Sequence, residues 1–128
     1  MTTPVEQLLR TAQAWAGDRP DVAAVFLVGS QARGQARPDS DVDLVILTSE
    51  PGRYFEDRTW LEAFGAVERW QTEDWGRVQA LRVWYRGGPE VEFGLTSADW
   101  ADEPLDEGTR RVLQAGFVVV FDRFPRGV

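Results

Sequence analysis

The segment between residues 22 and 48 constrains the fold most strongly, because it holds two apolar runs of strand length close together. Val22–Val28 is continuously apolar, contains β-branched residues and is followed by Gly29, which is typical of a buried central strand. Asp41–Thr48 is polar at its start and apolar afterwards, and it predicts a second strand. The core of this chain must therefore be built around a β-sheet.

The remaining sequence predicts helices and further strands around these two. A capping box at Thr3 followed by apolar residues at helical spacing predicts an amphipathic helix over residues 1–17. Further helices are expected at 30–34, 59–70 and 106–115, and turns at 35–40 and 50–53. Further strands are expected at 77–85, 90–95 and 117–121, and the first two of these are joined by a hairpin turn at Gly87-Gly88. No repeat, linker or low-complexity segment interrupts the chain, so we expect residues 1–128 to form a single domain. Its expected class is α+β, with a mixed β-sheet of about five strands and helices packed on it.

Three missing residue types restrict the chemistry that this chain can perform. It has no cysteine and no histidine, and all 14 of its basic residues are arginine. Disulfides, zinc sites built from Cys and His, and Ser-His-Asp triads are therefore excluded. A P-loop and a Schiff-base enzyme are excluded as well, because each needs a lysine. Carboxylates, hydroxyls and arginines remain, together with the hard cations that oxygen ligands hold.

The charge balance narrows the range of partners. The net charge is -7, which argues against a broad phosphate-binding surface and against duplex DNA as a partner. No apolar run approaches the roughly 20 residues of a membrane span. The first ten residues lack the basic start and apolar middle of a signal peptide. We therefore expect a cytoplasmic protein that binds neither membrane nor duplex DNA.

The polar residues that border the two apolar strands form a candidate site. Asp41 and Asp43 are two apart on a strand, so their carboxylates share one face with Cα atoms roughly 6.5–7 Å apart. Like charges this close repel each other, and a cation between them relieves the repulsion. Gly29 allows close approach of a ligand to the backbone, and Ser30 begins a short helix whose free N–H groups attract phosphate. A phosphate cradle beside a dicarboxylate metal site is typical of metal-assisted phosphoryl or nucleotidyl transfer.

This pattern resembles the nucleotidyltransferase superfamily of DNA polymerase beta, and most closely its minimal nucleotidyltransferase branch. The shared features are Val28-Gly29-Ser30, a gap of ten residues, and then Asp41-Val42-Asp43-Leu44. The extended forms of both motifs, Gly29–Gly34 and Ser40–Leu44, are present as well. The resemblance extends from Val22 to about Leu95, and it implies the polymerase beta-like nucleotidyltransferase fold.

The resemblance also implies a metal site with a third carboxylate from a later strand. Val91-Glu92-Phe93 fits that setting best, although the family more often has Asp there. Glu90 is the alternative, because it lies on the same face of the expected strand. By this resemblance Asp41, Asp43 and Glu92 are catalytic and bind two Mg²⁺ or Mn²⁺ ions.

The nucleotide-binding residues follow from the same resemblance. Gly29 and Ser30 are expected to hold the triphosphate, and Arg33 to neutralise a phosphate oxygen. The implied activity is metal-dependent transfer of a nucleoside monophosphate to an acceptor hydroxyl with release of pyrophosphate. The implied donor is ATP, which makes the transferred group AMP.

The acceptor stays open, because relatives usually carry an extra domain that holds it. A partner chain or a second copy of this chain is one way to complete such a site. Two alternative functions stay open beside the enzyme. One is an antitoxin-type protein that adenylylates or simply binds a small helical toxin, and the other is a nucleotide-sensing module without turnover.

Overall fold

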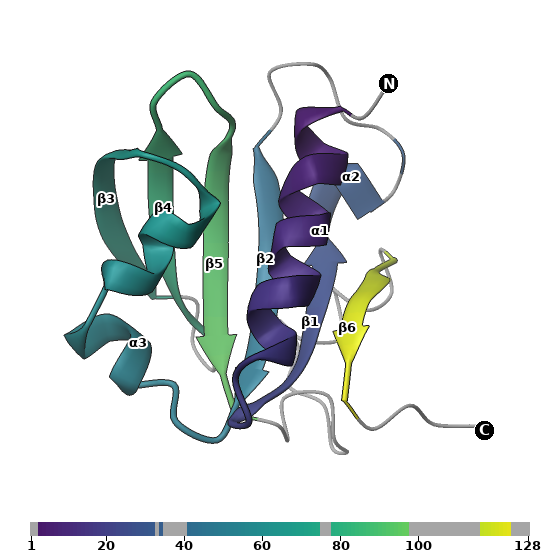
Figure 1. The fold of residues 1–128 in the computed structure, drawn as a ribbon, viewed down its shortest axis with the longest axis vertical. Helices are drawn as coiled ribbons and strands as arrows, with labels where there is room; N and C mark the ends of the chain where they lie inside the picture. The colour runs from purple at the N-terminus through teal and green to yellow at the C-terminus, as the bar shows by residue number, and fades with distance from the viewer. Residues whose placement is uncertain (1–2, 33, 35–40, 75–77, 98–115, 124–128) are drawn as a thin grey trace.

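The two apolar segments form neighbouring strands within a mixed sheet (Figure 1). The computed structural model describes residues 3–32, 34, 41–74, 78–97 and 116–123. Within these residues both apolar segments form strands, as predicted, and β1 (Val22–Val28) pairs antiparallel with β2 (Val42–Thr48). Val28 lies opposite Asp43 in this pairing, so the end of β1 meets the start of β2.

Four further strands among the described residues complete the sheet. They are β3 (Val67–Asp74), β4 (Gln79–Tyr85), β5 (Glu90–Thr96) and β6 (Val118–Asp122). The strand order is β3-β4-β5-β2-β1-β6. Only the β2–β5 pairing in this sheet is parallel, and all the other neighbours are antiparallel. Because β2 and β5 run in the same direction, both begin at the same end of the sheet.

The described helices are one long helix and several short ones. Helix α1 (Pro4–Gly17) begins at the predicted cap, where the Thr3 hydroxyl accepts a hydrogen bond of 3.0 Å from the Glu6 N–H. Helix α2 (Gly29–Ala32), helix α3 (Arg53–Glu56) and the 3₁₀-helix η1 (Thr59–Phe64) are short. Helices α1 and η1 lie across the same face of the sheet (Figure 1). None of the described helices is long and apolar enough to cross a membrane.

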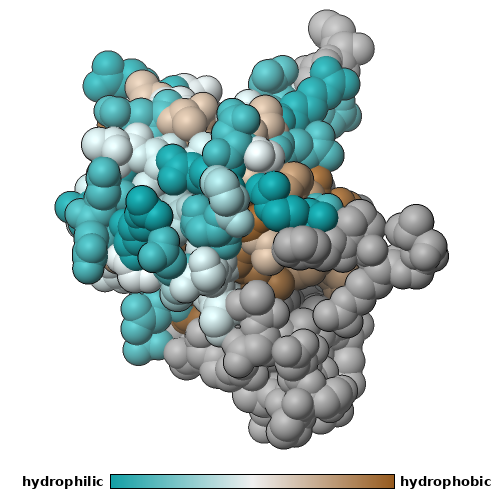
Figure 2. Space-filling model, turned by 60° about the horizontal axis from the view of Figure 1, so that its bottom comes forward, coloured by the Kyte–Doolittle hydropathy of each residue, from teal (hydrophilic) through white to brown (hydrophobic). Residues whose placement is uncertain are grey.

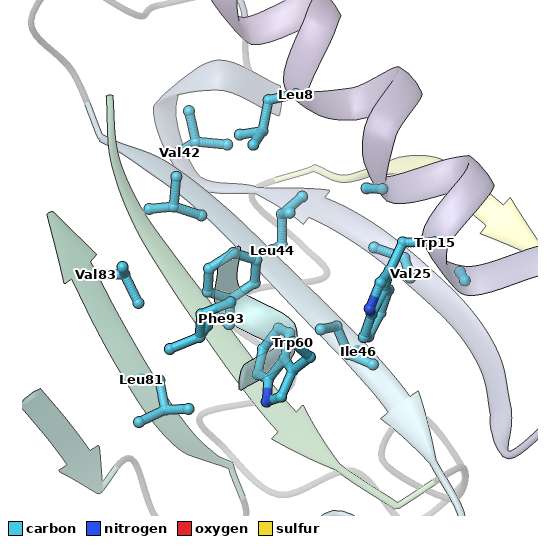
Figure 3. Close-up of a cluster of buried hydrophobic side chains, with 14 of the residues drawn as sticks. Leu8, Trp15, Val25, Val42, Leu44, Ile46, Trp60, Leu81, Val83 and Phe93 are labelled. Carbon is cyan, nitrogen blue, oxygen red and sulfur yellow. The ribbon is translucent and has the colours of Figure 1, made fainter. Parts of the chain in front are cut away.

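The main core fills the space between α1, η1 and the sheet (Figure 3). Trp15 and Trp60 are buried there, as their helical spacing predicts, with ring centroids 5.3 Å apart. The Trp60 ring also meets Phe93 of β5 edge to face, with centroids 5.0 Å apart. Val42 and Leu44 of β2 point into this core. Because side chains alternate along a strand, Asp43 points to the opposite face of the sheet.

The surface of the described residues is mostly hydrophilic, in contrast to the apolar core. In the view of Figure 2, hydrophilic residues cover most of the described surface and the most hydrophobic ones gather in one band. Phe117, Val118 and Val119 are exposed at the start of β6, although the pattern of the preceding strands buries most apolar side chains.

The sequence prediction for residues 59–70 is wrong in part. The helix expected at 59–70 ends at Phe64 as a 3₁₀-helix, and residues 67–74 instead form β3, the sixth strand. Val67 continues the apparent helical spacing of the preceding apolar residues, but Gly65 has a φ of 145° and ends the helix. Strand β3 lies at the edge of the sheet and is mostly exposed, so it carries no alternating apolar signal. The turn predicted at 50–53 is confirmed, since the Arg53 N–H donates a hydrogen bond of 3.2 Å to the Glu50 carbonyl, and α3 begins at its last residue. The helix predicted at 106–115 and the turn at 35–40 lie outside the described residues.

The end of the sheet opposite to the start of β2 is held together by Asp21. Its carboxylate accepts hydrogen bonds from the hydroxyls of Thr48 and Tyr54. Burial alone would raise the pKa of Asp21, but these two hydrogen bonds outweigh burial and lower the pKa below its ordinary value of 3.8. Asp21 therefore joins the start of β1, the end of β2 and helix α3. A cavity of about 560 Å³ lies beside it, lined by Trp15, Tyr54 and Trp60 among others.

We expect Asp21→Asn to lower the free energy of unfolding at neutral pH by about 1.5–3 kcal/mol, because it weakens hydrogen bonds to a charged group. The pKa of Asp21 is lower in the folded state, so this stability is present above the unfolded pKa and is lost as the pH falls through the folded pKa. Urea unfolding of both proteins between pH 7 and pH 2 tests this. A stability difference that is the same at both ends of this range would contradict it.

Candidate functional site

Three carboxylates meet at the end of the sheet where β2 and β5 begin. Asp41 directly precedes β2, Asp43 is its second residue, and Glu92 is the third residue of β5. The parallel register places Asp43 directly opposite Glu92. One oxygen of each carboxylate lies within 4.8 Å of the corresponding oxygens of the other two. The structure thus brings together all three residues that the sequence predicted as metal ligands.

The three carboxylates differ in how far they are removed from water. The Asp41 and Asp43 side chains are half-buried, whereas Glu92 is only 3% exposed. Glu92 Oε1 is buried and has no hydrogen-bond partner. An unsatisfied buried carboxylate oxygen is costly, and a cation held by several oxygens removes that cost. The donor set therefore fits a hard divalent cation such as Mg²⁺ or Mn²⁺.

The structure distinguishes Glu92 from its alternative Glu90. Glu92 lies in the cluster with Asp41 and Asp43, whereas Glu90 lies at the start of β5 and accepts a hydrogen bond from Arg82 Nη1. The two residues share a face of β5, as predicted, but the third carboxylate of the cluster is Glu92. Its strand also lies inside the sheet, between β4 and β2.

Arg82 of β4 contacts the carboxylates from the neighbouring strand, and none of the motifs described above includes it. In the antiparallel register Arg82 lies opposite Glu92, and its Nη2 donates a hydrogen bond of 2.9 Å to Glu92 Oε2. The same guanidinium also contacts Glu73, Glu90 and Asp41. One sequence signal could have revealed it, because Arg82 is the charged residue inside the otherwise apolar run Leu81–Tyr85.

The electrostatics of the cluster follow from burial and from crowding of like charges. Burial, together with the neighbouring Glu73 carboxylate, raises the pKa of Glu92 to about 8. The neighbouring Glu92 carboxyl and the hydrogen bonds from Arg82 lower the pKa of Glu73 to about 2. Burial opposes the charged form of Arg82, but the carboxylates of Glu73, Glu92 and Glu90 raise its pKa above the ordinary value. Arg82 is therefore a permanent cation, and without a second cation the site favours a protonated Glu92.

Gly29, the first residue of the predicted phosphate-binding segment, lies against the carboxylate of Asp43. Its φ is 77°, a left-handed conformation that favours glycine. A Cβ at this position would lie 2.3 Å from Asp43 Oδ2, which no real side chain permits. Backbone conformation and close contact with Asp43 therefore both require glycine here. Ser30 follows in the first turn of α2, whereas Arg33 lies outside the described residues.

The comparisons with known proteins agree with this geometry. A family model described as a nucleotidyltransferase domain matches residues 8–76, which is 69 of the 128 residues. No curated protein sequence matches the chain.

Several solved structures share the fold at low sequence identity. An aminoglycoside 6-adenyltransferase from Bacillus subtilis is 16% identical with a TM-score of 0.62, over 80% of this chain and 38% of that one. Cid1 in complex with the UTP analogue UMPNPP is 17% identical with a TM-score of 0.54, over 88% and 33%. The polymerase core of TRAMP, an RNA surveillance complex, is 15% identical with a TM-score of 0.56, over 70% and 30%. The chain thus spans about a third of the length of these structures.

We expect Gly29→Ala to disrupt the carboxylate site, because the added methyl group displaces the Asp43 side chain. The positive φ alone costs roughly 1–2 kcal/mol of stability. Gly34→Ala is the matched control, since Gly34 has a φ of 69° with nothing within 4 Å of the added Cβ. Both variants should lose similar backbone stability in urea unfolding, but only Gly29→Ala should lose Mn²⁺ binding in calorimetry. Equal Mn²⁺ affinity of the two variants would contradict this account of Gly29.

Proposed function

The chain belongs to the nucleotidyltransferase domain family, and from this premise we propose that it transfers a nucleoside monophosphate from a nucleoside triphosphate to an acceptor hydroxyl. The observation that carries the proposal is the meeting of Asp41, Asp43 and Glu92 at one end of the sheet. In the proposed reaction the acceptor hydroxyl gives its proton to Glu92, its oxygen bonds to the α-phosphorus, the bond from that phosphorus to the oxygen bridging to the β-phosphate breaks, and pyrophosphate leaves.

The chain's own residues have distinct proposed roles in this reaction. Asp41, Asp43 and Glu92 hold two divalent cations, Mg²⁺ or Mn²⁺, and Glu92 also orients the acceptor hydroxyl. When bound, these cations neutralise charge on the phosphates and lower the pKa of the attacking hydroxyl. Gly29 and Ser30 hold the triphosphate, since a glycine beside a helix start offers free N–H groups to phosphate. Arg33 neutralises a phosphate oxygen.

We propose ATP as the donor, on the family resemblance and on the structural likeness to an aminoglycoside adenyltransferase. The likeness to Cid1 bound to a UTP analogue makes UTP the competing donor. The cytoplasmic location expected from the sequence stays a prediction.

The acceptor is the least constrained part of the proposal. Because residues 1–128 span about a third of the length of their structural neighbours, we propose that they act as one catalytic domain and that the acceptor is held from outside them, for example by a partner chain or a second copy. A small helical protein is one such partner. The direct experiment incubates the protein with each α-³²P-labelled nucleoside triphosphate and Mg²⁺ or Mn²⁺, and follows label transfer to candidate acceptors and to the protein itself. Transfer in the presence of metal and none in EDTA supports the proposal, and no transfer or pyrophosphate release with any nucleotide argues against it.

Asp43→Asn separates the chemistry of the site from its folding. The side chains are nearly isosteric, and the substitution removes one of several crowded negative charges, so we expect the apo protein to be no less stable. Transfer should fall by at least about 10³-fold, because the transition-state charge loses its stabilisation. Thermal unfolding and the labelled-nucleotide assay measure the two effects. A variant that keeps near wild-type transfer removes Asp43 from the proposed mechanism.

Glu92→Gln and Glu90→Gln form a matched pair on the same face of β5. We expect Glu92→Gln to abolish transfer while nucleotide binding through Asp41 and Asp43 largely survives, since Glu92 belongs to the carboxylate cluster. Glu90→Gln should affect both only mildly, because the glutamine oxygen still accepts the hydrogen bond from Arg82. Calorimetry with ATP and Mg²⁺ measures binding, and the labelled-nucleotide assay measures transfer. If Glu90→Gln abolishes transfer and Glu92→Gln has only a mild effect, the assignment of Glu92 as the third ligand is wrong.

A further inference from the structure

We propose that Arg82 is a positioning residue that orients Glu92 for cation binding, and that Glu73 and Glu90 hold Arg82 in place for this task. The inference rests on the proposed function and adds a role for three residues that lie outside the carboxylate cluster. Arg82 acts through Glu92, and it does not touch the reacting atoms.

The guanidinium plane is fixed by contacts on two of its edges. Along one edge, Arg82 Nε lies 3.1 Å from Glu73 Oε2 and Nη2 lies 3.4 Å from Glu73 Oε1. At the other edge, Nη1 donates to Glu90. A side-on contact with both oxygens of one carboxylate constrains orientation as well as position. The 25% exposure of Arg82 shows that these bonds form largely out of water.

The fixed guanidinium then binds Glu92 through one oxygen only. Arg82 Nη2 donates 2.9 Å to Glu92 Oε2, while Glu92 Oε1 is buried without a hydrogen-bond partner. A glutamate has three side-chain torsions, so a strand alone does not determine where its carboxylate points. The bond from Arg82 fixes one oxygen of Glu92 and leaves the other for a cation shared with Asp41 and Asp43.

The charge of Arg82 and its orienting contact with Glu92 predict opposite changes in cation affinity when Arg82 is replaced. Arg82 Nη1 lies 3.6 Å from Asp41 Oδ2, so removing its positive charge would tighten cation binding if simple electrostatics governed the site. Loss of orientation would weaken cation binding instead. Partners that orient metal ligands typically change metal affinity by about 10–100-fold. The sign of the change therefore separates the two explanations.

The test measures Mn²⁺ affinity of the apo protein by electron paramagnetic resonance, which needs neither nucleotide nor acceptor. Arg82→Gln removes both the positive charge and the planar guanidinium with its fixed set of N–H donors. Arg82→Lys keeps the positive charge but loses that planar set of donors. Arg69→Gln is the matched control, because Arg69 is an exposed arginine of the adjacent strand β3 that stacks on Trp84, 3.9 Å from the ring centroid. Thermal unfolding reports whether each variant is folded.

We expect both Arg82 variants to bind Mn²⁺ at least about tenfold more weakly than the wild type, and Arg69→Gln to bind it equally. In the Glu92→Gln background, Arg82→Lys should have no further effect, because the residue acts through Glu92. Unchanged or tighter Mn²⁺ binding by Arg82→Lys overturns the inference. So does a loss of Mn²⁺ affinity on Arg82→Lys that is as large in the Glu92→Gln background as in the wild type. Arg82→Lys decides the question even if Arg82→Gln does not fold. If the wild type binds no Mn²⁺, the proposed function itself fails and this inference falls with it.

Discussion

The parallel pairing of β2 with β5 is the constraint on which the rest of the site depends. It places Asp43 directly opposite Glu92, although 49 positions separate them in the sequence. Parallel pairing also brings the starts of both strands to one end of the sheet, where Asp41 joins them. A one-residue slip in this register would turn Glu92 into the aromatic core and Phe93 out of it. Because Phe93 is fully buried against Trp60, the hydrophobic core fixes the register that assembles the carboxylates.

The main core and the carboxylates lie on opposite faces of the sheet, and the carboxylate face also holds a smaller buried cluster that includes Val28, Val45 and Leu47. One face carries α1, η1 and the aromatic cluster, and the carboxylates extend from the opposite face. The two ends of the sheet also differ. At one end Asp21 accepts hydrogen bonds from two hydroxyls, so its charge contributes to stability. At the other end acidic side chains crowd around Arg82 and leave a buried oxygen of Glu92 unsatisfied, which is a cost that folding alone does not explain.

The sequence predicted the parts of this structure that have strong local signals. The apolar runs identified β1 and β2, the capping box at Thr3 identified α1, and alternation beside the Gly87-Gly88 turn identified β5. The spacing of Asp41 and Asp43 predicted their shared face. Strand β3 was missed because an exposed edge strand has no hydrophobic period. Arg82 and Glu73 were missed because their importance comes from pairing between β3, β4 and β5, which no local pattern records.

The central claim is that the fold holds Asp41, Asp43 and Glu92 together for divalent cations. Anomalous diffraction from crystals of the apo protein soaked in Mn²⁺ tests it most directly. The account predicts an anomalous peak bound by one oxygen from each of these three residues, at the roughly 2.0–2.2 Å typical of small hard cations. An empty cluster in crystals that bind Mn²⁺ elsewhere, or a peak that excludes Glu92, would contradict it.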